Sequence, residues 1–195
     1  MINQCAANGL LQEAVSELAQ CRHIEAVFND CFRQRYRCEL VGGADEPYYQ
    51  PGEAGDLHRV YYREDFPRSA LHEAAHWCVA GEQRRQLVDY GYWYEPDGRS
   101  VERQREFERV EATPQAIEWF FSLAAGLDFQ VSIDNLGAGK LDEFPFKLAV
   151  WQRAKAYQRV GLPPRAEQLF RALCAANGVP LSAVMQGISL RALCR

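Results

Sequence analysis

The segment from Pro67 to about Gln86 carries the pattern His-Glu-x-x-His, at His72, Glu73 and His76. On a helix, residues i and i+4 lie on one face, one turn apart, so both histidines can direct a ring nitrogen at a single metal ion. The spacing therefore predicts a helix here, with Ser69 as a cap at its start. Glu73, at the edge of the same face, is placed to contact a metal-bound water as a catalytic residue.

A metal that performs chemistry needs a third protein ligand and an open position. The next helical pattern, over residues 101–126, carries four polar side chains on one stripe, opposite its apolar residues: Glu108, Glu111, Gln115 and Glu118. Glu118 lies deep in the helix and Glu108 lies a turn earlier. We therefore predict Glu111, near Pro114, as the third ligand, with Glu108 in reserve; a solvated acidic face is the alternative interpretation.

Two histidines and one carboxylate suit two kinds of chemistry. With zinc, the set polarises a water molecule and Glu73 acts as general base for hydrolysis. With iron(II), it is the facial triad that leaves positions open for dioxygen and substrate. The motif alone favours zinc, although a metzincin-type protease would need glycine at Val79 and histidine at Glu82. His23 and His58 have no such companions, and we expect both to be structural.

The rest of the pattern predicts an α+β fold, with a small mixed sheet covered by helices. Residues 10–32 indicate two helices or one broken helix, and residues 38–41 and 57–62 look like short strands. The aromatic stretch 87–94 has extended character.

Further along the chain, Pro114 either kinks the helix over residues 101–126 or starts a second one. A helical pair is expected over residues 146–177, broken at residues 161–164.

The length of 195 residues fits one domain and is short for two. No apolar run approaches the roughly 20 residues of a membrane-spanning helix, and the N-terminus lacks the regions of a signal peptide. A cytoplasmic location without membrane contact is the expectation. Seven cysteines, an odd number without any Cys-x-x-Cys pair, predict reduced thiols.

Charge is unevenly distributed along the chain. The first 145 residues hold 14 Lys and Arg against 25 Asp and Glu, whereas residues 146–195 hold 8 against the single Glu167. This predicts a basic C-terminal surface, including Arg153, Arg159 and Arg171, that docks an acidic macromolecule; a solvated helical face is the alternative. The overall charge of −4 argues against direct nucleic-acid binding.

Longer blocks around the motif extend these observations. They are residues 70–81 and 84–99, flanked by Asp45-Glu46-Pro47, by residues 107–111 with 114–116, and by residues 131–136. Together they closely resemble the bacterial elongation factor P hydroxylase family. The resemblance covers about residues 24–175 of a single hydroxylase-like domain, and leaves residues 1–20 as an N-terminal extension and residues 176–195 as a C-terminal tail.

The resemblance implies hydroxylation of the β-lysyl-modified lysine of elongation factor P, at a non-haem iron(II) centre with dioxygen as co-substrate. It implies His72, His76 and Glu111 as metal ligands, in a fold similar to a metal-dependent endoribonuclease. It also moves the prediction from zinc to iron and makes Glu73 a proton-handling residue. A zinc-dependent peptidase or ribonuclease, with Glu73 as general base, is the alternative.

The substrate that the resemblance implies, elongation factor P, is an acidic tRNA mimic. An acidic substrate would suit the basic C-terminal surface of this chain. The aromatic run Tyr90–Tyr94 either lines a channel for the long modified lysine or forms a half-buried strand.

Overall fold

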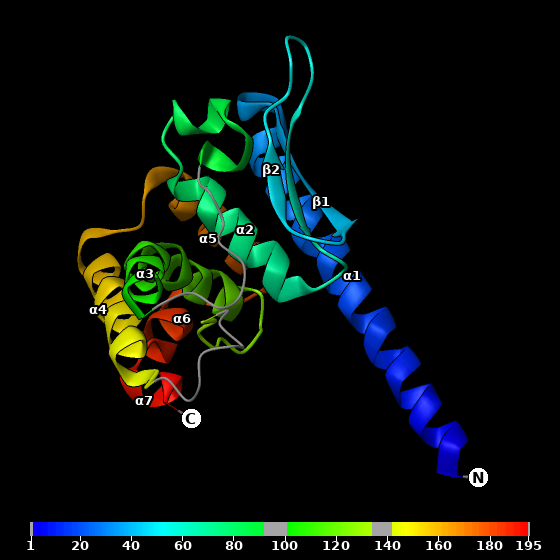
Figure 1. The fold of residues 1–195 in the computed structure, drawn as a ribbon. Helices are drawn as coiled ribbons and strands as arrows, with labels where there is room; N and C mark the ends of the chain where they lie inside the picture. The colour runs from blue at the N-terminus through cyan, green and yellow to red at the C-terminus, as the bar shows by residue number, and fades with distance from the viewer. Residues whose placement is uncertain (1, 92–100, 134–141, 195) are drawn as a thin grey trace.

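The computed structural model describes residues 2–91, 101–133 and 142–194, without the side chains of residues 2–14 and 101. The chain runs through a long N-terminal helix, a small sheet, the motif helix with two short 3-10 turns, and a helical C-terminal half (Figure 1). In chain order the elements are α1 (Ile2–Tyr36), β1 (Cys38–Ala44), β2 (Tyr48–Gln50), β3 (His58–Arg63), α2 (Pro67–Val79), η1 (Arg84–Gln86), η2 (Val88–Gly91), α3 (Val101–Ala124), α4 (Phe144–Val160), α5 (Pro164–Asn177), α6 (Leu181–Gly187) and α7 (Leu190–Leu193).

The sheet is mixed, as predicted, and has the strand order β1-β3-β2. β1 pairs with β3 in parallel, with Cys38 opposite His58, and β2 pairs with β3 antiparallel, with Tyr49 opposite Val60. The two strands predicted from the sequence are therefore confirmed. β2 was not predicted, because a strand of three residues is too short to display an alternating pattern.

One carboxylate ties α1 to this sheet. Glu25 of α1 is buried and accepts hydrogen bonds from the Tyr62 hydroxyl (3.0 Å) and from the Gly42 backbone N–H (3.0 Å). Arg22 pairs with the same carboxylate at 2.8 Å. Tyr62 and Gly42 lie on neighbouring strands, so a single side chain fixes both strands against the helix.

The motif helix α2 begins differently from the prediction. Its N-cap is Phe66, with Pro67 at the first helical position and no side-chain cap. Ser69 was wrongly expected to cap the helix: its hydroxyl instead accepts a hydrogen bond from the backbone N–H of Arg63 (3.0 Å). Proline suits the first position because the N–H that it lacks would have no helical partner there.

The same helix ends at Val79, seven residues before the predicted end at Gln86. The stretch expected to be extended, residues 87–94, is also wrong in its described part. Residues Val88–Gly91 form η2, in which Asp89 (φ 48°) and Tyr90 (φ 57°) are left-handed. Tertiary contacts override the β preference of the aromatic residues: Asp89 Oδ1 accepts from the Tyr49 N–H (2.8 Å), and Tyr90 stacks on the Tyr49 ring. Residues 92–94 lie outside the described residues.

The prediction of two helices or one broken helix at the N-terminus is wrong, because this segment is one continuous helix, α1. Of the two alternatives at Pro114, the start of a second helix is wrong, because α3 runs unbroken through this residue. The C-terminal pair is confirmed as α4 and α5, separated at Gly161. Across the described ranges, helices long and apolar enough to span a bilayer are absent.

Candidate metal centre

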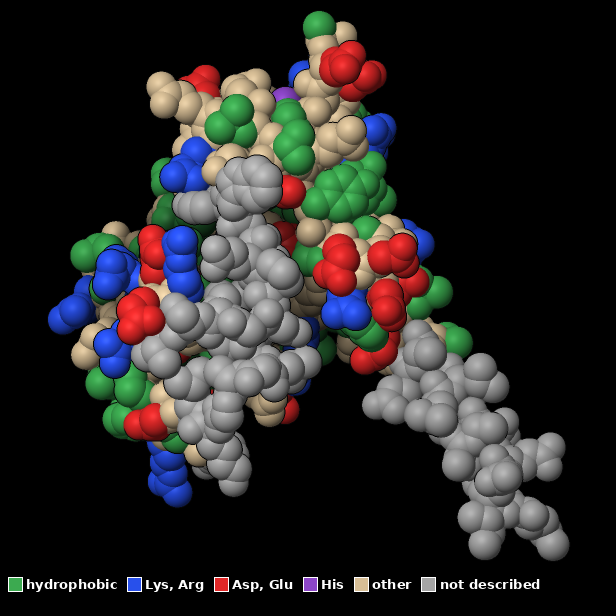
Figure 2. Space-filling view, viewed as in Figure 1, with side chains coloured by type: hydrophobic (Ala, Val, Ile, Leu, Met, Phe, Trp, Pro, Cys, Tyr) green, Lys and Arg blue, Asp and Glu red, His purple; other side chains and the backbone are tan. Residues whose placement is uncertain are grey.

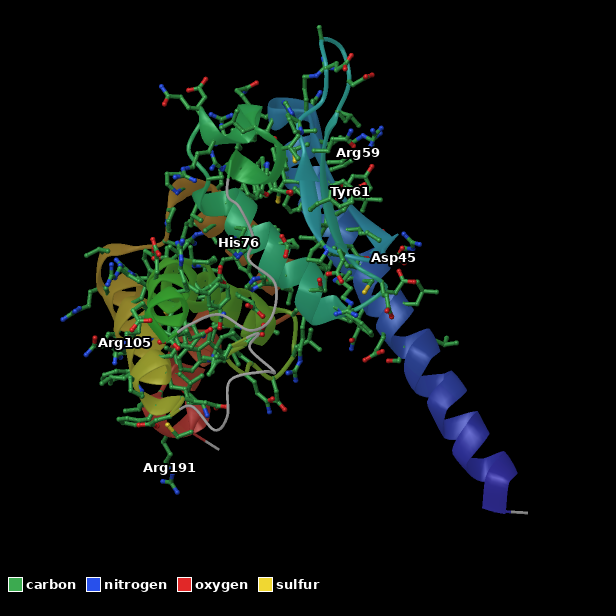
Figure 3. The ribbon with its side chains drawn as sticks, viewed as in Figure 1. Asp45, Arg59, Tyr61, His76, Arg105 and Arg191 are labelled. Carbon is green, nitrogen blue, oxygen red and sulfur yellow. The ribbon has the colours of Figure 1, made fainter. Side chains whose placement is uncertain are left out.

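Two packed helices, α2 and α3, bring the predicted ligands together. His72 and His76 lie one turn apart on α2, and Glu111 projects from α3. The His72 Nε2 and His76 Nε2 atoms are 3.0 Å apart. Glu111 Oε2 lies 3.6 Å from His72 Nε2, and Glu111 Oε1 lies 3.3 Å from His76 Nε2. Figure 3 shows His76 on the side of α2 that faces α3. Within the described part of the chain, these three residues are the group of His, Cys, Asp or Glu that could hold a metal ion.

The spacing of the donor groups fits a single ion. Ligand atoms about 2.1 Å from a metal are about 3.0 Å apart at a right angle and about 3.4 Å apart at the tetrahedral angle. The two histidine Nε2 atoms are 3.0 Å apart, and each lies 3.3–3.6 Å from one of the two Glu111 carboxylate oxygens, so these distances lie around the two values. The imidazole and carboxylate donors suit both iron(II) and zinc, so the residues fit a metal without deciding which one.

Glu118 gives the site a fourth member that was not predicted. It was set aside as a metal ligand because it lies deep in its helix, and it stays outside the donor set, but its Oε2 lies 2.7 Å from His72 Nδ1, the ring nitrogen that faces away from the cluster. A carboxylate only accepts, so Nδ1–H is the donor. The helical stripe was the signal that could have found this residue, since Glu111 and Glu118 are two turns apart on α3.

Gln115, between these two glutamates, supports the third ligand. Its side-chain amide donates to the Ser132 carbonyl (2.7 Å) and accepts from the Ser132 N–H (3.0 Å). These two hydrogen bonds to one backbone residue fix the orientation of the side chain. The same amide nitrogen lies 3.4 Å from Glu111 Oε2. Gln115 is 1% exposed, so this support is buried inside the protein.

The other predicted candidates lie at the edge of the cluster. Glu108 accepts from the Gln104 side-chain amide (3.3 Å) instead of joining the donor set. The Glu73 carboxylate has no hydrogen-bond partner among the residues that the structure describes, and burial raises its pKa, partly offset by His72 and His76. His58 is structural, as expected: its Nδ1 accepts the Gly52 N–H (2.9 Å).

Charges inside the cluster shift two ionisation equilibria. Burial lowers the pKa of His72, but the Glu118 carboxylate, then Glu111 and Glu73, raise it more strongly, to about 10. Burial raises the pKa of Glu111, whereas the charge and hydrogen bond of His76 and the charge of His72 lower it to about 2. Without metal, a cationic His72 therefore faces an ionised Glu111 at neutral pH.

Metal binding is expected to release about one proton per ion at pH near 7.5, because the metal replaces the proton on His72. Because the pKa of His72 is raised, the ion pairs of the protonated ring stabilise the metal-free protein fully at pH values below 6.5, the ordinary pKa of histidine. This stabilisation is lost as the pH rises through about 10. Metal affinity should accordingly rise with pH up to about that value. Calorimetric titration in buffers of different ionisation enthalpy counts the protons; a count of zero would contradict the assignment of His72.

Two arginines close the C-terminal end of the motif helix. Arg165 of α5 donates to the carbonyls of Trp77 (3.1 Å) and Cys78 (3.0 Å), and to that of Ala80. Arg85 donates to the Ala80 carbonyl as well (2.7 Å). The Arg165 guanidinium also lies 4.9 Å from the Trp77 ring centre. Carbonyls at a helix end need such donors, and a cation there complements the helix dipole.

The basic C-terminal half divides into several environments. Figure 2 shows Lys and Arg side chains gathered over α3 and α4 on the face in view. Arg153 and Arg159 are exposed, Arg171 pairs with Glu167 at 2.6 Å, and Arg165 is half-buried at the end of α2. Only part of the excess positive charge is therefore free for a partner, and docking on it stays a prediction.

The six described cysteines are free thiols, as predicted.

Taken together, the fold and the site define a protein with a partly buried two-histidine, one-carboxylate cluster, built from two packed helices beside a small mixed sheet. The chain belongs to the elongation factor P hydroxylase family, whose model matches residues 27–186. It is 52% identical over 153 residues to the elongation factor P lysine hydroxylase of Haemophilus influenzae. The aligned region covers 78% of this chain and 86% of that protein. All members of the cluster lie inside the matched range.

Proposed function

We propose that this chain hydroxylates a lysine of elongation factor P. The observation that carries the proposal is the 52% identity, over most of both chains, to a protein named for that activity. The cluster of His72, His76 and Glu111 supports it by offering a position for a metal.

Iron(II) is the metal in this proposal. Hydroxylation places oxygen on a carbon atom, and a two-histidine, one-carboxylate iron(II) centre, when bound, supplies the dioxygen chemistry for that step. His72, His76 and Glu111 would hold the ion, and a set of three protein ligands would leave further coordination positions for dioxygen and substrate. One atom of dioxygen enters the substrate, and reduction of the other to water requires two electrons from an external reductant.

Glu73 is the proposed proton-handling residue. It adjoins His72 in sequence, it is half-buried, and its carboxyl group has a raised pKa because of burial. A carboxyl group whose pKa is raised toward neutrality can hold a proton and release it during a reaction. Glu118 and Gln115, buried behind the ligands, keep the donor set in place.

The substrate in this proposal is the β-lysylated form of the factor. The test incubates the purified protein anaerobically with iron(II) and ascorbate, adds labelled dioxygen, and supplies the factor with and without the β-lysyl group. Mass spectrometry of the lysine-containing peptide should show a gain of one labelled oxygen atom, larger for the β-lysylated factor. No gain with either form, in protein shown to contain iron, would refute the hydroxylase assignment.

A zinc-dependent hydrolase is the second candidate, since imidazole and carboxylate donors also suit zinc and Glu73 stands at the motif position from which a general base would act. Cleavage of a peptide or an RNA by the zinc-loaded protein without dioxygen would support it. The same sample tested with iron and dioxygen separates the two functions.

We further infer that residues 1–195 work as one domain in the cytoplasm, in a fold related to a metal-dependent endoribonuclease. The support for a single domain is that side chains from α1, the sheet, α2, α3, α4 and α5 share one hydrophobic core. Limited proteolysis tests this inference: a single protease-resistant fragment that contains α1 through α5 is expected, and separate stable fragments would contradict it.

A further inference from the structure

Glu118 is a carboxylate buried in an environment that would ordinarily disfavour it. It is 7% exposed, and its neighbours on α3 include the buried Trp119 and Phe120. Removing a carboxylate from water is costly unless a charged or hydrogen-bonding partner compensates. Among the residues that the structure describes, the compensating contact of its carboxylate is to His72, at 2.7 Å.

That contact determines how the His72 ring faces the cluster. With the proton on Nδ1 directed at Glu118, Nε2 is left with a free lone pair once the ring is neutral. Nε2 is also the atom that lies 3.0 Å from His76 and 3.6 Å from Glu111. The hydrogen bond therefore selects the tautomer that can ligate a metal, and it aims that nitrogen at the metal position.

We propose that Glu118 is a positioning residue of the metal centre: it holds His72 in the ligating tautomer and supplies the second negative charge of the site. Together with Glu111, it balances the two positive charges of a divalent ion in a poorly hydrated cluster. The inference rests on the proposed function, because it assumes that the cluster holds a metal. Carboxylates behind a metal-bound histidine typically raise its basicity and contribute about 10–100-fold to metal affinity.

Two variants separate orientation from charge. Glu118→Gln keeps an oxygen that accepts from Nδ1–H but removes the charge, whereas Glu118→Ala removes both. Glu106→Gln is the matched control, since Glu106 lies on the same helix but pairs with Arg103 at the surface. Titration of each protein with Zn²⁺ and, anaerobically, with Fe²⁺ should give affinities about 10–100-fold weaker for Glu118→Ala, a smaller loss for Glu118→Gln, and no change for Glu106→Gln.

Nitrogen NMR of the zinc-loaded wild-type protein provides a measurement that does not depend on the variants. His72 should carry its proton on Nδ1 and bind zinc through Nε2. The opposite tautomer would overturn the inference even if both Glu118 variants failed to fold, and so would unchanged metal affinity in folded variants. Failure of the wild type to bind either ion would instead refute the metal centre on which the proposed function depends.

Discussion

Replacing His76 with alanine is expected to abolish hydroxylation while leaving the protein folded. The variant would retain only His72 and Glu111 of the donor set. Loss of a residue behind a ligand typically weakens metal binding about 10–100-fold, so loss of a ligand should cost more than about 100-fold. We expect hydroxylation, measured by mass spectrometry at a fixed iron concentration, to fall at least about a thousand-fold.

The fold should survive because His76 contributes little to the core. Its side chain is 20% exposed, whereas the apolar face of α2 is fully buried through Leu71, Ala74 and Trp77. Circular dichroism and thermal unfolding of the metal-free proteins should therefore be close to wild type. His23→Ala, at an exposed histidine of α1, is the control and should change neither activity nor metal content. An unfolded His76→Ala protein would indicate a structural metal and argue against a catalytic centre.

Replacing Gly42 with alanine is expected to lower the free energy of unfolding by about 1–3 kcal/mol, the usual cost of overpacking. A β-carbon at this position would lie 2.4 Å from the Tyr62 hydroxyl oxygen and 2.6 Å from the adjoining ring carbon. Tyr62 is fully buried and its hydroxyl is bonded to Glu25, so the ring cannot move aside without losing that contact. Denaturant titration measures the loss.

Gly81→Ala is the matched control for this substitution, because a β-carbon there would have no atom within 4 Å. It should change the unfolding free energy by no more than about 0.5 kcal/mol. Gly42 packs on Tyr62 and donates to Glu25, neither of which belongs to the metal cluster, so the metal affinity of its folded variant should be unchanged. An alanine at position 42 as stable as wild type would contradict the rigid role assigned to Tyr62 and Glu25.

The sequence predicted the features that local spacing controls. The helical position of His72 and His76 follows from an interval of four residues, and the structure places both rings as that interval requires. Glu111 was reached by elimination, and the structure brings it to the same two nitrogens. Its role as a metal ligand stays a prediction for metal analysis to test.

Features that depend on packing between distant segments were missed. Glu118 meets His72 across 46 residues, and no periodicity in either helix shows which nitrogen of the ring it reaches. The left-handed Tyr90 likewise depends on the Tyr49 ring, 4.4 Å away, on a strand that the sequence analysis did not find. The carbonyls at the early end of α2 are bonded by Arg165, which belongs to the other half of the chain.

The cap that Arg165 provides also has a consequence for synthesis of the protein. Arg165 is made 88 residues after Trp77, whose carbonyl it binds, so a nascent chain contains both histidines and Glu111 well before it contains the donor that completes α2. Assembly of the motif helix in its final form therefore waits until α5 has left the ribosome. A metal ion that meets the chain before that point would find the two histidines on a helix that still lacks its Arg165 cap.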